Sequence, residues 1–70
     1  MNAYYKTNVT TTRQAEILTR LIHKRIYYAG ELSFDLMHQH KLLSAVGIKK
    51  TETGIISQCM TDLGFSCEQL

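Results

Sequence analysis

Five side chains of this 70-residue chain have the chemistry to hold a metal or to take part in catalysis: His23, His38, His40, Cys59 and Cys67. His38 and His40 are two residues apart, a spacing that directs them to different sides of a helix, and no CxxC or HxxxH pair supplies half of a structural zinc site. A nucleophilic cysteine needs a base positioned beside it, and the sequence indicates none. We therefore expect no metal, no cofactor, no small-molecule substrate and no enzymatic activity.

A second group of polar side chains, in the segment "GIKKTETGIISQCMTDLGF" from Gly47 to Phe65, has the chemistry to contact DNA. Short hydrogen-bonding side chains read base edges, while lysines and the amides of a helix N-terminus hold phosphates. The alternative is the ordinary polar face of a surface helix. The candidate DNA-binding residues of this segment are Lys49, Lys50, Thr51, Thr53, Ser57, Gln58 and Thr61.

Three more basic residues, Arg13, Arg20 and Lys24, would form a stripe along one face of a helix in the first half of the chain. They could contact phosphates beside the recognition surface, or simply form a solvated face. The net charge of +2 is only weakly basic, so it permits a nucleic-acid partner without requiring one.

The elements expected to position these residues make a single domain over residues 1–70. Residues 1–10 are an arm or a short strand, and helices are predicted over 11–29, 34–46 and 52–63. Thr11 with Gln14 can cap the first helix, Gly30 and Gly47 would stop the first two, Thr51 or Thr53 can cap the third, and Gly64 would end it. The predicted shared core is Leu21, Ile22, Leu43, Ile56, Met60 and Leu63.

Residues 40–65, "HKLLSAVGIKKTETGIISQCMTDLGF", resemble the second and third helices of winged-helix and helix-turn-helix domains in the turn "AVGI" and the ending "LGF". The resemblance implies a mainly α, three-helix helix-turn-helix-like domain with a minor short β element. It also implies a small DNA-binding accessory or regulatory protein that binds double-stranded DNA with its third helix. Only "SCEQL" follows Phe65, so the strand of any wing would be abbreviated or would pair with the N-terminal segment.

The tyrosines support a different function, since Tyr combines apolar area with a hydroxyl and is enriched at protein interfaces. A small protein of the phage or mobile-element type that binds and inhibits or bridges another protein, or forms a homodimer, is the alternative. No secretory signal and no apolar run of transmembrane length is visible, so the cytoplasm is the expected location. The candidate interface residues are Tyr4, Tyr5, Tyr27 and Tyr28.

Overall fold

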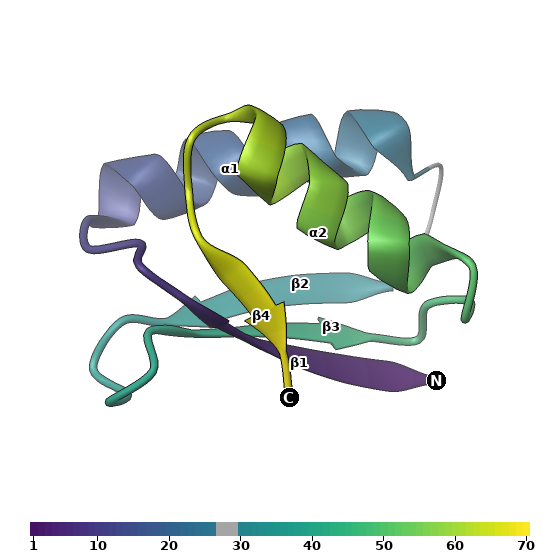
Figure 1. Cartoon of the computed structure of the whole chain (residues 1–70), viewed down its shortest axis with the longest axis horizontal. Coiled ribbons are helices and arrows are strands. Elements are labelled where there is room, and N and C mark those ends of the chain that lie inside the picture. The colour runs from purple at the N-terminus through teal and green to yellow at the C-terminus, as the bar shows by residue number, and fades with distance from the viewer. Residues whose placement is uncertain (27–29) are drawn as a thin grey trace.

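The computed structural model describes residues 1–26 and 30–70, and this part forms a four-stranded sheet with two helices on one side of it (Figure 1). The elements follow in the order β1 (Asn2–Thr7), α1 (Thr12–Arg25), β2 (Glu31–Asp35), β3 (Leu42–Val46), α2 (Glu52–Asp62) and β4 (Cys67–Gln69). The strand order is β2-β3-β1-β4, and every neighbouring pair is antiparallel. This is the split βαβ, or ferredoxin-like, arrangement. Because folds of this kind carry many unrelated functions, the arrangement alone identifies none.

The expectation of a mainly α, three-helix helix-turn-helix-like domain is wrong, because the chain is a small α+β domain. Residues 34–46, expected to form the second helix, instead contribute the end of β2, a turn and all of β3. A helix-turn-helix needs two successive helices joined by a short turn, whereas a strand precedes α2 here.

The β2–β3 hairpin forms because its strands alternate between the two faces of the sheet with a period of two residues. Leu32 and Phe34 pack against the core, and they lie beside the fully buried Ala45 and Leu43 of the neighbouring strand. In the turn, Asp35 Oδ1 accepts a hydrogen bond from the Met37 N–H at 3.1 Å. Such side-chain bonds offer the backbone an alternative to the helix.

Gly30 does not stop the first helix, which ends four residues earlier with Ile26 as its C-cap. It lies where the start of β2 meets the end of β3, and a Cβ at Gly30 would come within 1.5 Å of the Val46 carbonyl oxygen. Only glycine permits so close an approach of two backbones.

The core lies between the helices and the sheet and combines residues from both. β1 alternates strictly, so that Ala3, Tyr5 and Thr7 are buried while the residues between them are exposed. Of the predicted core, Ile22, Leu43, Ile56 and Met60 are fully buried and Leu21 is half-buried. The prediction is wrong for Leu63, the C-cap of α2, which is 40% exposed and is not part of the core.

The helix ends follow local signals in two of four cases. Thr11 accepts a hydrogen bond from the Gln14 N–H (3.1 Å) at the start of α1. At the end of α2, Gly64 (φ 88°) and Phe65 donate backbone hydrogen bonds to Thr61 and Met60, which is a Schellman motif. The start of α2 differs, since neither Thr51 nor Thr53 caps it; Glu52 instead accepts a hydrogen bond from the Lys49 N–H. After this stop, β4 returns to pair with β1.

Candidate functional site

The seven residues predicted to contact DNA lie on α2 and in the turn before it, but they do not form one open reading surface. Thr53 and Ser57 are half-buried, and the other five are exposed. The Thr53 and Thr61 hydroxyls donate to the carbonyls of Lys50 (2.8 Å) and Ser57 (3.0 Å), so both are committed to their own helix. Ser57 lies beside Cys67 of β4. Burial raises the pKa of the Cys67 thiol, and the hydrogen bond with Ser57 partly offsets this increase.

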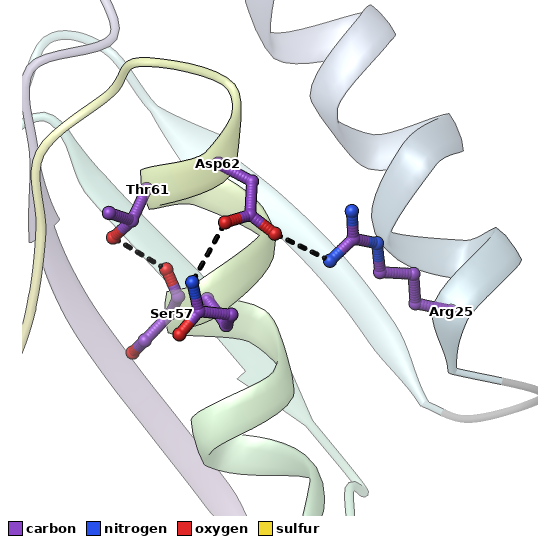
Figure 2. Close-up of polar contacts among 5 residues, drawn as sticks. Arg25, Ser57, Thr61 and Asp62 are labelled. Atoms are coloured by element: carbon purple, nitrogen blue, oxygen red, sulfur yellow. Dashed lines mark hydrogen bonds and ion pairs between the residues drawn. The ribbon is translucent and has the colours of Figure 1, made fainter.

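Gln58, the remaining residue predicted to contact a base edge, is hydrogen-bonded to a carboxylate. Its Nε2 donates to Asp62 Oδ1 at 2.8 Å, and Asp62 Oδ2 pairs with Arg25 Nη1 of α1 at 3.0 Å (Figure 2). The hydrogen bond from Gln58, followed by the contact with Arg25, lowers the pKa of Asp62. The charged Asp62 carboxylate therefore lies one helical turn after Gln58, whose amide we expect to contact a base. Its negative charge would repel a nearby DNA phosphate.

The predicted basic stripe of Arg13, Arg20 and Lys24 is exposed along α1. Arg20 and Glu16 both line a groove, so the helix side of that groove carries one positive and one negative charge. Arg13 and Lys24 are not among the residues that line this groove.

The tyrosines divide between core and surface. Tyr5 is fully buried, and its hydroxyl donates to the Thr53 carbonyl at 2.9 Å, so it joins β1 to α2 rather than offering an interface. Tyr4 lies on the uncovered face of the sheet and is 42% exposed. Tyr27 and Tyr28 lie outside the described residues.

The candidate ligands for a metal are dispersed. Within residues 1–26 and 30–70, no group of three or more His, Cys, Asp and Glu side chains is placed to hold a metal ion. The His38 and His40 rings lie near each other in the β2–β3 turn, with centroids 5.4 Å apart, and His38 Nδ1 accepts a hydrogen bond from the His40 N–H. Cys59 is buried, and burial raises the pKa of its thiol.

A groove of about 490 Å³ lies between α1 and β2. Its volume lies within the roughly 300 to 1,000 Å³ that is usual for ligand sites. Leu32, Ser33 and Phe34 form the sheet side, and Leu36 continues it into the turn. The helix side is formed by Thr12, Ala15, Glu16, Thr19 and Arg20.

The groove runs beside a free strand edge. β2 is one of the two edge strands of the described sheet, with β3 as its only neighbour. An edge strand presents a row of backbone N–H and C=O groups with no partner on its outer side. The groove thus combines apolar side chains with backbone groups that can still pair.

Sequence reasoning missed this site, although one signal was present. The alternation of "ELSFD" directly after Gly30 is typical of a half-buried strand. That α1 and β2 leave a hollow between them depends on tertiary packing, which the alternation does not reveal.

No family model, curated protein or solved structure matches this chain. Among the described residues, neither helix has the length and apolarity needed to cross a membrane. The surface of the molecule is therefore the basis for assigning a function.

Proposed function

We propose that this chain is a protein-binding module that takes an extended segment of a partner protein along the outer edge of β2. The observation that supports it is the apolar groove between α1 and β2, open beside a strand that has one neighbour. The proposal belongs to the second of the two functions expected from the sequence, but it places the interface on β2 instead of on the tyrosines.

Strand addition explains why the two features occur together. The backbone of an added segment would continue the hydrogen-bonded ladder of the sheet, which gives affinity without regard to sequence. Every second side chain of that segment would point to the helix side, next to Leu32 and Phe34, and would enter the groove. These positions would supply the specificity.

DNA binding stays a prediction with weaker geometric support. It requires free polar groups on α2, whereas Gln58 is bound to Asp62 and the Thr53 and Thr61 hydroxyls are bound to backbone. The exposed Lys49 and Lys50 remain able to contact phosphates.

The test is a titration of the isotope-labelled protein with an acetylated and amidated peptide, Gln-Val-Ser-Val-Gln, followed by the chemical shifts of the backbone amides. We expect the largest changes at residues 31–36 and on the groove side of α1. Changes confined to other parts of the surface, or none at all at millimolar peptide, would contradict the proposal.

A pair of variants separates the groove from the rest of α1. Thr19→Leu places a larger side chain in the groove, where it would occupy space needed by the peptide side chains, and Leu is a better helix former than Thr, so the variant should weaken peptide binding without weakening α1. Ile17→Ala is the matched control, because Ile17 lies on the same helix, is 47% exposed and does not line this groove. Equal peptide affinity in both variants would remove the groove from the binding site.

A further inference from the structure

We infer that the segment received by β2 carries a lysine or arginine at two positions four residues apart, with apolar residues between them that face the groove. The inference rests on the proposed function and names the chemistry of the partner at the same site.

The charges on β2 lead to the inference that the partner segment is basic at these two positions. Glu31 and Asp35 are both exposed, and they lie on the face of the sheet opposite Leu32 and Phe34. Four residues of strand separate their Cα atoms by roughly 13 Å. An added strand would therefore meet one carboxylate near each end of its contact with β2.

These two carboxylates lack opposite charges across the strand. The register places Val46 opposite Glu31 and Leu42 opposite Asp35, and neither residue is charged. On the same face, by contrast, Glu68 of β4 lies opposite Lys6 of β1. Within the described residues the single ion pair is Arg25 with Asp62, so neither acid of β2 is paired with a cation. Asp35 Oδ1 accepts the turn hydrogen bond from the Met37 N–H, and this bond leaves the negative charge of the carboxylate uncompensated.

The helix wall of the groove does not change this preference. It carries one acid and one base, Glu16 and Arg20, whose charges offset each other. Opposite charges in directly facing cross-strand positions are favourable, and like charges are unfavourable. The complementary segment has the pattern basic, apolar, small, apolar, basic, with the small residue next to Ser33.

The same charges argue against a second copy of the chain as the occupant. If two β2 strands paired antiparallel about Ser33, Glu31 of each copy would lie opposite Asp35 of the other. Two facing pairs of like charge would oppose this association, as charged residues do at many natural sheet edges.

The experiment compares three capped peptides that differ only at their ends: Lys-Val-Ser-Val-Lys, Gln-Val-Ser-Val-Gln and Glu-Val-Ser-Val-Glu. Each is titrated into the full chain at low salt and followed by amide chemical shifts. We expect the lysine peptide to bind more tightly than the glutamine peptide by about 1.5- to 5-fold for each charged pair, and the glutamate peptide to bind most weakly. Added salt should reduce these differences.

Variants of β2 identify the carboxylates responsible for the preference for the lysine peptide. Glu31→Gln with Asp35→Asn should abolish the preference for lysine without weakening the glutamine peptide. Glu31→Lys with Asp35→Asn, which keeps a side-chain oxygen as the acceptor in the turn, should reverse the order, so that the glutamate peptide binds best. Glu68→Gln, which neutralises an acid on the same face at the far edge, is the control and should leave the order unchanged.

Two negative results have different meanings. If all three peptides shift the amides of β2 with equal affinity, the basic partner is overturned while strand addition stands. If none of the three shifts them, the proposed function itself fails. Loss of the preference in Glu68→Gln would also overturn the assignment to Glu31 and Asp35.

Discussion

Replacing Tyr5 with Phe removes the hydroxyl that joins β1 to the first turn of α2. The ring is fully buried, and its hydroxyl donates to the Thr53 carbonyl at 2.9 Å across 48 residues of sequence. Phe keeps the ring and its packing, so the change isolates one hydrogen bond. At neutral pH we expect the free energy of unfolding to fall by about 0.5 to 1.5 kcal/mol.

The pH dependence of stability in the alkaline range is a more specific test of the buried Tyr5 hydroxyl. Burial, with a smaller effect from Cys67, raises the pKa of Tyr5 from 10.0 to about 12. Between those values the folded state keeps the phenol proton while the unfolded state loses it, so the stability contributed by Tyr5 is complete below pH 10 and is lost as pH rises toward 12. The full shift corresponds to about 2.7 kcal/mol, and we expect roughly 1 to 2 kcal/mol after screening by water around so small a core.

Urea titrations of the parent and of Tyr5→Phe between pH 9 and 12 measure this effect as the difference between their free energies of unfolding. All other residues are the same in the two proteins, so their contributions to the difference largely cancel, apart from the contact of Cys67 with Tyr5. We expect the parent to be the more stable protein at pH 9 and to lose that advantage by pH 12. Parallel stability curves over this range would refute the buried position of Tyr5 beneath α2.

Further predictions concern packing, glycines, thiols and DNA. In urea titrations, Leu43→Ala should cost about 2 to 5 kcal/mol, whereas Leu63→Ala should cost less than about 1 kcal/mol because Leu63 is 40% exposed; equal costs would contradict the observed core. Gly54→Ala should raise the free energy of unfolding by roughly 0.5 to 1 kcal/mol, since open space surrounds this helical position, while Gly30→Ala should lower it because its Cβ would meet the Val46 carbonyl; thermal melts that rank them in the opposite order would be inconsistent with the hairpin. With a thiol reagent at pH 8, buried Cys59 should react only as fast as the protein opens, and stabilising the fold by Gly54→Ala should slow it; labelling at the rate of a free thiol would place Cys59 at the surface. If the chain binds DNA, mobility shifts at two salt concentrations should show a steep loss of affinity with salt, and Lys50→Ala should lower that slope by about one unit; the absence of any shift at low salt would rule DNA binding out.

Local signals in the sequence located the elements whose ends are determined by neighbouring residues. Thr11 with Gln14 marks the start of α1, and Gly64 followed by Phe65 marks the end of α2. Both depend on side chains and dihedral angles within a few residues, which the sequence displays directly.

The hairpin was not predicted because its stability comes from distant partners. Residues 34–46 contain leucine, methionine and lysine, which are good helix formers. They form a strand because β3 pairs with β1, as in the contact of Ala45 with Ala3, and tertiary pairing overrides a weak local preference. The sequence indicates a helix stop at Gly30 for the same reason. Its close approach to Val46 exists only once the sheet has formed.

The candidate site shows the same limit. The types of the polar residues on α2 are visible in the sequence, but the sequence does not reveal that Asp62 binds both Gln58 and Arg25, or that Tyr5 is buried. The groove lies between α1 and β2, and its existence depends on how far apart packing holds a helix and a strand edge.

The central claim is that a partner segment pairs with the backbone of β2, and a pair of backbone-methylated peptides tests it most directly. Lys-Val-Ser-Val-Lys is prepared with N-methyl groups on alternate residues in the two possible phases, which leaves the side chains unchanged and blocks one edge of the peptide at a time. We predict that one phase abolishes the amide shifts of residues 31–36 while the other preserves them, because an added strand directs one edge toward β2. Equal binding by both methylated peptides and the parent peptide would show that no strand pairing occurs and would contradict the account.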